Sequence, residues 1–376
     1  MLILNTTTAG VEKYRMLEPN LYLSKHHDFP IEILQGNIQE STFNQHKIIF
    51  AHFSIAQNST IVAQLKQIQK NGMKLIIDVD DYWEVPPTHS LYGFIKQNNI
   101  VQKTIELLKM ADCVTCSTKY LAEKIRIINK NVVVLPNSLD PEKISIKKKK
   151  SNKIRLGWSG GSSHYEDIKL LKDLGLNSKL SNENVQFILA GFDSKIRTTD
   201  NKIVEGFNQT IWRKYEEVIT NNYTVLSEGY KRHLLTADKH KKYFNEDNEV
   251  YKRVWTKSIS KYLKNMNMID IFLVPLIENE FNKYKSELKI IEAGFYKVPV
   301  IASSIQQYDD VINHGENGYL VEQKRAHKDF TKYVKVYVNN PDIMQEHGHR
   351  LHELCMDKFN LQKNSAKRLE FYDSLT

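Results

Sequence analysis

The residues best placed to bind an anion surround one predicted helix start, in FNKYKSELKIIEAGFYKVPVIAS at 281–303. Lys285 stands just before the predicted first turn, where backbone N–H groups lack partners. Lys289 and Glu292 follow at spacings of four and three, which would place all three side chains on one helix face. A diphosphate could contact Lys285 and the helix start, while Glu292 could accept hydrogen bonds from ribose hydroxyls. The alternative is a Lys–Glu surface pair worth about a few tenths of a kcal/mol.

A second candidate site is the glycine pair in LGWSGGSSHYED, where Gly160 and Gly161 separate a strand pattern from a helix pattern. Glycine lets backbone N–H groups approach a phosphate, and the dipole of the following helix favours negative charge. The motif is neither GxGxxG nor a P-loop, so a tight turn without a ligand is the alternative. His164 is close enough to take part, although a surface histidine is the simpler interpretation.

Carboxylates follow another strand pattern, in LIIDVDDYWEVPPTHS. We expect Asp80 and Asp81 to end this strand, where they could orient an acceptor hydroxyl or stabilise developing positive charge. A capping cluster before the two prolines that follow is the alternative. Trp83 and His89 are candidates for lining the same side of a site.

Short β-rich runs alternate with helical patterns around these stretches, which predicts an α/β fold with doubly wound parallel sheets. The strand candidates are 47–54, 73–80, 112–117, 131–137, 153–161, 185–193, 269–276 and 298–304; helical spacing covers 59–72, 94–111 and most of 327–375. The pattern restarts after a lysine-rich segment. We therefore expect Rossmann-like domains at 1–145 and 154–335, a linker at 146–153, and helices at 336–376 that pack back toward the first domain. Ligands of such sheets bind at the carboxyl ends of the strands, so the cleft between the domains is the expected site.

The composition restricts the class of protein. A net charge of +9 over 376 residues favours an anionic partner, although a lysine-rich surface is an equally simple explanation. No apolar run reaches the ~20 residues of a membrane span, and the N-terminus lacks a signal-peptide pattern, so we expect a cytoplasmic protein. Cys113 and Cys116 have no second pair to complete a zinc site, so we expect them to be structural.

Four segments, in this order along the chain, resemble the large retaining family of GT-B glycosyltransferases (glycosyl transferases group 1, family 4-like). TTTAGVEKYRMLEPNLYL resembles the family's first loop and helix, and VLPNSLDP the end of its first domain. IRLGWSGGSSHYEDIKLL resembles the start of its second domain, and the stretch from 281 to 304 with GENGYLVE its donor site. Together these segments extend over almost the whole chain.

The resemblance implies a GT-B enzyme that transfers a sugar from a nucleotide-diphosphate sugar, UDP- or GDP-linked, with retention and without a metal. It implies an acceptor-side first domain and a donor-binding second domain. The catalytic residues would be Asp80, Asp81 and Lys285. The donor would be bound by Lys285, Ser286 and Glu287 at the diphosphate, Glu292 at the ribose, Gly160 and Gly161 at a phosphate-facing turn, Gly191 and Phe192 near the base, and Gly10 near the sugar. Trp83 and His89 would lie on the acceptor side.

Two features depart from or complicate this resemblance. Tyr284 stands where many family members have the first Glu of an E-x7-E motif, which leaves the identity of the sugar open. Asp78-Val79-Asp80 spells the metal-binding DXD of the other glycosyltransferase fold, GT-A, but Asp78 is predicted inside a strand and parallel-sheet domains fit GT-B. Many relatives have a His near this point, and Asp80 or Asp81 would replace it.

Three functions fit the sequence. The first is synthesis of a glycan or polysaccharide on a lipid-linked or sugar acceptor, with the positive charge holding the protein near the inner face of an anionic membrane. The second is glycosylation of DNA bases, with the lysine-rich segments 147–153 and 231–242 contacting phosphates. The third is a catalytically inactive nucleotide-sugar binder, for which Tyr284 is the only support.

Overall fold

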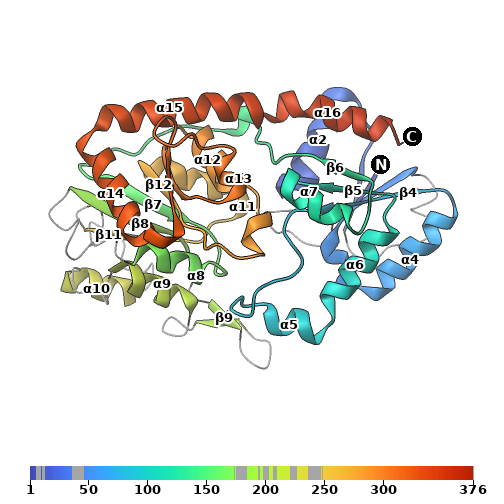
Figure 1. Ribbon diagram of the computed structural model, residues 1–376, viewed down its shortest axis with the longest axis horizontal. Helices are drawn as coiled ribbons and strands as arrows, with labels where there is room; N and C mark the ends of the chain where they lie inside the picture. Colours follow the sequence, from blue (N-terminus) through green and yellow to red (C-terminus); the bar gives the residue numbers. More distant parts are fainter. Residues whose placement is uncertain are drawn as a thin grey trace. The chain divides into compact units, whose positions relative to one another are not determined.

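The computed structural model describes residues 1–5, 10, 13–35, 46–172, 174, 184–193, 195–197, 203–205, 210–220, 227–235, 247 and 249–375. The chain divides into two compact units. The first unit comprises Met1–Pro141, Asn279–Ile291 and Met356–Thr376, and the second comprises Glu142–Glu278 and Glu292–Cys355. Each unit contains one six-stranded parallel sheet with helices packed around it (Figure 1).

The sheet of the first unit has the strand order β2-β1-β3-β4-β5-β6. Its strands are β1 (Leu2–Asn5), β2 (Glu32–Gln35), β3 (Ile48–His52), β4 (Lys74–Val79), β5 (Cys113–Cys116) and β6 (Val132–Val134). Its helices are η1 (Lys13–Leu17), α2 (Glu18–His27), η2 (Phe53–Gln57), α4 (Ser59–Lys70), α5 (Tyr92–Gln97), α6 (Ile100–Met110), α7 (Lys119–Arg126), η9 (Asn282–Tyr284) and α16 (Leu361–Asp373). The order reverses between β1 and β3, which makes the carboxyl ends of these two strands the topological switch point of the sheet.

Central strands of this sheet are apolar because helices cover both of their faces. All five residues of β3 are buried, and β4 is buried from Leu75 to Val79. The amphipathic helix α4 buries Leu65 and Ile68 against the sheet, and its N-terminus is capped by Asn58, whose Oδ1 accepts hydrogen bonds from the backbone N–H of Thr60 and Ile61.

One helix predicted from the sequence is two helices in the structure. The spacing over 94–111 indicated a continuous helix, but α5 ends at Gln97 and α6 begins at Ile100. Asn99 between them has a positive φ of 52°. Asparagine adopts this left-handed conformation more readily than most residues, and it cannot continue a right-handed helix.

The last helix of the chain packs inside the first unit. Tyr372 of α16 is fully buried, and its hydroxyl donates a hydrogen bond of 2.9 Å to Asn20 Oδ1 on α2. Its ring stacks on Phe29 and meets Phe50 of β3 edge-on. Near the other end of this helix, Leu361 N donates to Leu139 O at 2.9 Å.

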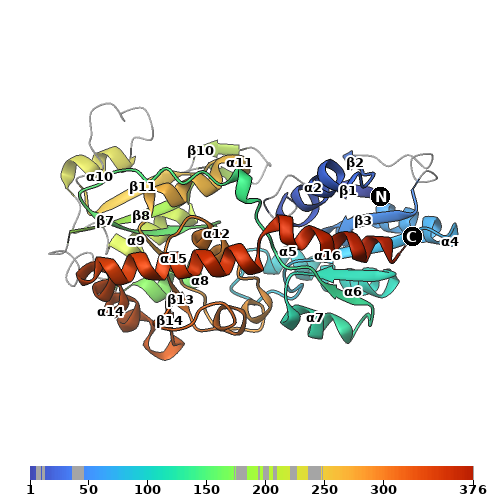
Figure 2. The ribbon, with the colours of Figure 1, turned by 90° about the horizontal axis from the view of Figure 1, so that it is seen from above.

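The sheet of the second unit has the strand order β11-β8-β7-β12-β13-β14, and Figure 2 shows β7, β8 and β11 side by side. Its strands are β7 (Ile154–Ser159), β8 (Val185–Phe192), β11 (Tyr251–Trp255), β12 (Ile271–Val274), β13 (Val300–Ser303) and β14 (Tyr319–Val321), and β9 (Lys195–Arg197) pairs separately with β10 (Ile203–Glu205). Its helices are α8 (Tyr165–Ile168), η4 (Lys169–Leu171), α9 (Ile211–Thr220), α10 (Glu228–Leu235), α11 (Ile259–Tyr262), η8 (Leu263–Met268), α13 (Gln306–Asp309), η10 (Gln323–Arg325) and α14 (Ala326–Asn339). Here the switch point lies between β7 and β12.

The chain passes from one unit to the other at four points: within η3 (Pro141–Lys143), between Glu278 and Asn279, within α12 (Leu288–Phe295) and within α15 (Pro341–Lys358).

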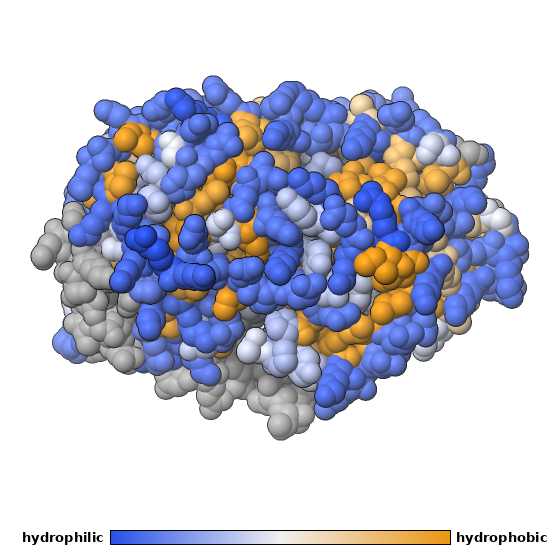
Figure 3. Space-filling model, viewed as in Figure 1, coloured by the Kyte–Doolittle hydropathy of each residue, from blue (hydrophilic) through white to orange (hydrophobic). Residues whose placement is uncertain are grey.

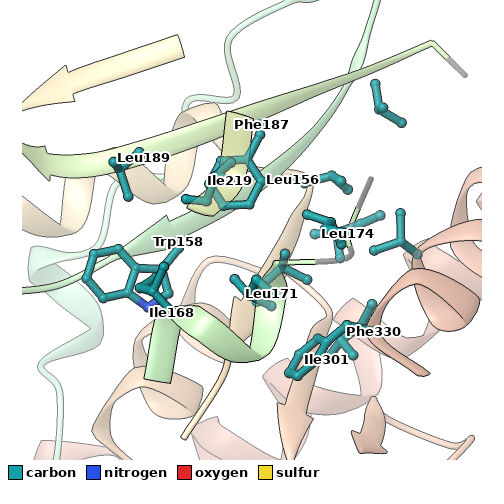
Figure 4. Close-up of a cluster of buried hydrophobic side chains, with 14 of the residues drawn as sticks. Leu156, Trp158, Ile168, Leu171, Leu174, Phe187, Leu189, Ile219, Ile301 and Phe330 are labelled. Atoms are coloured by element: carbon teal, nitrogen blue, oxygen red, sulfur yellow. The ribbon is translucent and has the colours of Figure 1, made fainter. Parts of the chain in front are cut away.

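The core of the second unit forms between its sheet and the helices α8, α9 and α14. Leu156, Trp158 and Leu189 project from β7 and β8, on the same side as Ile168 and Phe330 (Figure 4). All five side chains are completely buried. This core holds the end of β7, and with it the glycine turn that follows.

The surface is rich in polar side chains, as the composition predicted. On the face that Figure 3 shows, hydrophilic residues form most of the surface and hydrophobic residues gather in separate patches. Among the helices that the structure describes, none is long and apolar enough to cross a membrane.

The fold class predicted from the sequence is therefore confirmed: the chain forms two doubly wound parallel sheets and ends in helices. The pattern did not give β1, β2, β9, β10, β11 or β14, all of which have three to five residues. Such strands are too short for a clear alternation of apolar and polar residues.

Candidate functional site

The pairing of β3 with β4, next to the switch point of the first sheet, brings a histidine to the predicted carboxylates. His52 ends β3, and Asp80 and Asp81 directly follow the last residue of the neighbouring strand β4. His52 Nε2 lies 2.8 Å from Asp80 Oδ1, and His52 Nδ1 lies 2.9 Å from Ser54 Oγ. The sequence pattern did not predict His52 as a site residue, because its partner follows another strand and is 28 residues away.

Lys285 lies at the same cluster. Its Nζ is 3.4 Å from Asp81 Oδ2 and 4.4 Å from the centre of the Phe281 ring. Its backbone is extended, with φ −65° and ψ 157°, because α12 begins only at Leu288. The prediction that Lys285 shares a helix face with Lys289 and Glu292 was therefore wrong.

The two carboxylates differ in their electrostatic surroundings. Burial alone would raise the pKa of Asp80, but the contact with His52, including its hydrogen bond, and the charge of Arg15 lower that pKa below its ordinary value. Burial raises the pKa of Asp81, and the charge of Asp80 adds to this effect while Lys285 opposes it. Asp80 is thus held as a carboxylate, whereas Asp81 takes up a proton more readily than an ordinary aspartate.

Asp78 has a structural role in the same sheet. It forms a buried two-point ion pair with Arg15, with distances of 2.7 and 3.0 Å, and accepts a hydrogen bond of 2.6 Å from Thr115 Oγ1. A carboxylate that is saturated in this way does not serve as a metal ligand. Among the described residues, no group of three or more His, Cys, Asp or Glu side chains could hold a metal ion.

Ser286 is attached to the end of another strand. Asn137, which follows β6 after two residues, donates a hydrogen bond of 2.8 Å from Nδ2 to Ser286 Oγ. At the start of α12, the carbonyl of the buried Glu287 accepts hydrogen bonds from the backbone N–H groups of Ile290 and Ile291. Glu287 therefore stands at the N-cap of α12, one residue after Ser286.

The aromatic residues around the cluster pack mainly against one another. Trp83 is only 4% exposed, and its indole N–H has no hydrogen-bond partner among the residues described. His89 meets the Phe281 ring edge-on. Tyr284, which stands in place of the family's first Glu, packs against Tyr82 and donates a hydrogen bond of 3.0 Å to Glu280.

In the second unit, the predicted glycine turn follows β7 and is open to solvent at Gly161. Gly160 N donates to Ala190 O at 3.3 Å. Gly191 has a φ of 109°, and a Cβ atom at this position would lie 2.3 Å from Gly160 O. Only glycine fits here, because both the left-handed backbone and the close approach exclude a side chain.

Glu292 of α12 is buried, close to Tyr262. Burial raises the pKa of Tyr262, and the nearby charge of Glu292 adds to this effect while Ser159 opposes it. Ser159 is the last residue of β7, directly before the glycine turn. Glu292 is 2% exposed and is therefore held firmly in place.

His164 follows the glycine turn and is also paired with a carboxylate. Its Nδ1 is 2.7 Å from Asp167 Oδ2, and Asp167 Oδ1 accepts a hydrogen bond of 2.8 Å from Ile277 N beyond the end of β12. The backbone N–H of His164 donates to the Tyr215 hydroxyl at 2.7 Å. This histidine is thus anchored at the switch point of the second sheet, which its sequence position alone did not reveal.

Phe192 occupies the core rather than the surface. It is completely buried, with the Arg253 guanidinium 3.8 Å from its ring centre and Trp255 edge-on at 4.9 Å. Arg253 is itself paired with the buried Glu216. In this position Phe192 supports the chain next to Gly191 and does not present its ring to a ligand.

The other residues singled out from the sequence contribute less to the candidate site. Gly10 is half-buried, but residues 6–9 and 11–12 beside it lie outside the described residues. Burial raises the pKa of the Cys113 thiol to about 11 and that of Cys116 to about 12, so both stay protonated and unreactive. Of the lysine-rich segments, 236–242 lies outside the described residues, and Lys148 Nζ donates to the carbonyl oxygens of Met266 and Ile269.

Comparison with known proteins identifies the second half of this arrangement. Residues 176–340 match the model of the family described as Glycosyl transferases group 1. The match covers 165 of the 376 residues, which is less than half of the chain. Among curated proteins, the capsular polysaccharide biosynthesis glycosyltransferase CapM of Staphylococcus aureus is 23% identical over 252 residues, and the match covers 65% of this chain and 61% of CapM.

Solved structures give the fold of the whole chain. HepE of Anabaena, in complex with UDP-glucose, aligns with a TM-score of 0.66 at 12% identity over 99% of both chains. Sucrose-phosphate synthase of Thermosynechococcus elongatus aligns with a TM-score of 0.63 at 12% identity, over 100% of this chain and 98% of its own. The fold is therefore GT-B, and the residues that match the group 1 glycosyltransferase family lie within it.

Proposed function

We propose that this chain transfers a sugar from a UDP-sugar to a hydroxyl group of a glycan acceptor, in the biosynthesis of a polysaccharide. The match to the group 1 glycosyltransferase family, the relative named for capsular polysaccharide biosynthesis and the fold of a protein in complex with UDP-glucose all support this function. The observation that carries it is the contact of Lys285 with Asp81, directly after Asp80, at the carboxyl end of a parallel sheet. A cation for the leaving diphosphate and carboxylates for a hydroxyl group are the requirements of sugar transfer.

Lys285 is the proposed counter-ion of the donor diphosphate. Negative charge builds on the diphosphate as the bond to the sugar breaks, and a fixed ammonium group stabilises that charge. Ser286 and Glu287 precede the first turn of α12, whose unpaired N–H groups and dipole add to the effect. The hydrogen bond from Asn137 to Ser286 would hold this segment in position.

Glu292 is the proposed partner of the donor ribose. A buried carboxylate close to Tyr262 has a fixed orientation, which suits the recognition of two neighbouring hydroxyl groups. Gly160 and Gly161 would bring backbone N–H groups near phosphate oxygens, and Gly191 with the buried Phe192 would shape the chain near the base. Gly10 is the proposed contact of the first loop with the sugar.

Asp80 and Asp81 are the proposed acceptor-side carboxylates. Asp80 would accept a hydrogen bond from the acceptor hydroxyl and so orient it toward the sugar. Trp83 and His89 are the proposed neighbours of the acceptor. We further propose transfer with retention and without a metal, and a division into an acceptor-side domain at 1–145 and a donor domain at 154–335. A lipid-linked acceptor would bring the chain to an anionic membrane surface, which its net charge of +9 favours.

Thermal stabilisation by UDP, GDP, ADP, CMP and dTDP tests the donor site, because a ligand of the folded state raises the unfolding temperature. We expect UDP to give the largest shift, and Lys285→Ala and Glu292→Ala to abolish it. Release of UDP from UDP-sugars, with and without EDTA, then separates an enzyme from an inactive binder. Absence of a shift with every nucleotide would refute the proposed donor site. NMR of the anomeric proton of the product would test retention.

A further inference from the structure

The cluster at the end of β3 and β4 contains a histidine whose hydrogen bonds point to one tautomer. His52 Nδ1 accepts a hydrogen bond of 3.4 Å from the backbone N–H of Ser54, and Ser54 Oγ is 2.9 Å from the same nitrogen. A backbone N–H can only donate, so Nδ1 must carry a lone pair. The proton of the neutral ring then resides on Nε2, which lies 2.8 Å from Asp80 Oδ1 and donates to it.

The position of this pair in the fold favours a role at a site. His52 is the last residue of β3, one of the two strands at the switch point of the first sheet, where ligands of such sheets bind. Its side chain is 10% exposed and that of Asp80 12%, so both are packed yet retain contact with solvent. Ser117 Oγ also donates to the backbone carbonyl of Asp80, at 3.3 Å. The segment that presents Asp80 is thus held at two points.

We propose that His52 is the positioning residue of Asp80: its Nε2–H holds the carboxylate in one orientation and in its ionised form, ready to accept a hydrogen bond from the acceptor hydroxyl. This inference rests on the proposed function, because it assigns Asp80 to the acceptor. His52 itself touches no reacting atom. It acts through Asp80, as an imidazole that orients a partner by a single directed hydrogen bond.

The charged groups around Asp80 come from four segments. His52 approaches from β3, Arg15 from η1, Asp81 from its own segment, and Lys285, paired with Asp81, from the segment before α12. His52 is the largest of the stabilising influences on the Asp80 carboxylate, ahead of Arg15. Removing the hydrogen bond from His52 should therefore raise the pKa of Asp80.

Two substitutions of His52 separate positioning from a structural role. In His52→Asn, the amide oxygen lies near the place of Nδ1 and can still accept from Ser54 N, so the turn after β3 is retained while the donor to Asp80 is lost. In His52→Gln, the longer side chain can place its amide N–H near the position of Nε2 and donate to Asp80. His46→Asn is the matched control, because His46 forms a similar pair with Glu32 at 2.9 Å, next to the opposite end of β3.

The first measurement is independent of activity. In long-range ¹H–¹⁵N spectra of the full chain with labelled histidine, the signal of His52 is assigned as the one that is missing in His52→Asn. We expect this signal to be that of the Nε2–H tautomer. Its ring signals should shift in Asp80→Asn. A His52 signal with the proton on Nδ1 would overturn the inference.

The second measurement is the rate of UDP release from UDP-glucose over a range of pH. We expect His52→Asn to lower kcat about tenfold or more, with an unchanged KM for the donor, since a small misplacement of a reacting group has effects of this size. The acid limb of the pH profile of His52→Asn should move to higher pH. His52→Gln should retain most of the wild-type rate, and its acid limb should stay at the wild-type pH.

The outcomes distinguish this inference from the proposed function. A wild-type chain that is active, with His52→Asn equal to it in kcat and pH profile, would overturn the role of His52 and leave the proposed function intact. A wild-type chain that neither binds UDP nor releases it from UDP-glucose would overturn both. A loss in His46→Asn as large as that in His52→Asn would show a general structural effect and would also refute the inference.

Discussion

Replacing Asp81 with asparagine should make UDP bind about fivefold more tightly. Lys285 Nζ lies 3.4 Å from Asp81 Oδ2, so a diphosphate that takes Lys285 as its counter-ion competes with Asp81 for it. The same diphosphate also approaches the negative charge of Asp81. Asparagine retains the size of the side chain but carries no charge, so it removes both the competition for Lys285 and the repulsion of the diphosphate. Both changes favour UDP binding.

The size of this effect follows from the distance and the exposure of the pair. Coulomb's law gives about 1 kcal/mol in bulk water for charges at this separation, and about 5 kcal/mol at an effective dielectric constant of about 20. The Asp81 side chain is 37% exposed and that of Lys285 18%, so solvent screens the pair and the lower figure applies. About 1 kcal/mol corresponds to about a fivefold change in Kd.

Isothermal titration calorimetry with UDP and with uridine would test this reasoning. Uridine lacks the diphosphate, so Asp81→Asn should leave its affinity unchanged. The gain for UDP should also shrink as the salt concentration rises, because ions screen exposed charges. Lys285→Ala is the opposite control and should weaken UDP about tenfold or more. UDP binding that is no tighter in Asp81→Asn, or uridine that gains as much as UDP, would show that Lys285 does not exchange Asp81 for a diphosphate.

Three further substitutions test other parts of the structure. Gly191→Ala should reduce the free energy of unfolding, measured in denaturant titrations, by about 3 kcal/mol, because Gly191 has a positive φ and a Cβ atom there would clash with the backbone. Gly161→Ala is the control and should be as stable as the wild type, because the space around its Cβ atom is open. Asp78→Asn should cost about 3 kcal/mol because it leaves Arg15 buried without a counter-charge, and added Mn²⁺ should restore nothing. Asp80→Asn should lower the thermal midpoint more at pH 7 than near pH 3. Because the pKa of Asp80 is lower in the folded than in the unfolded state, Asp80 stabilises the fold at pH values above its unfolded-state pKa, and this stabilisation is lost as the pH falls through the folded-state pKa. An equal decrease of the thermal midpoint at both pH values would contradict this prediction.

The strands that carry the candidate site could be predicted because they are buried on both faces. The run IIFA of β3 and the run IFLV of β12 are apolar throughout, and helices with apolar spacing separate the strands. This alternation leaves few choices besides a parallel sheet. It also indicated which residues follow the carboxyl ends, and so it led to Asp80, Asp81 and Gly160.

Contacts between distant segments could not be predicted in the same way. Asn137 bonds Ser286 across 149 residues, and no local pattern relates the end of β6 to the segment before α12. The order of the strands decides which residues meet, and the sequence of elements allows several orders. His52 illustrates the point, because its place at the end of β3 was visible, whereas its neighbour Asp80 depends on β3 pairing with β4.

Lys285 shows why helical spacing alone misled the analysis of the donor segment. Spacings of three and four residues define a common face only where the backbone is helical throughout, and the chain from Lys285 to Glu287 is not part of α12. The extended backbone at Lys285 sends its side chain to Asp81, while Glu292, one turn inside the helix, is buried beside Tyr262. An extended residue before a helix is free of the periodicity that fixes its neighbours. A cation there can approach a carboxylate or a phosphate without moving the helix, which is the property that the exchange at Asp81 requires.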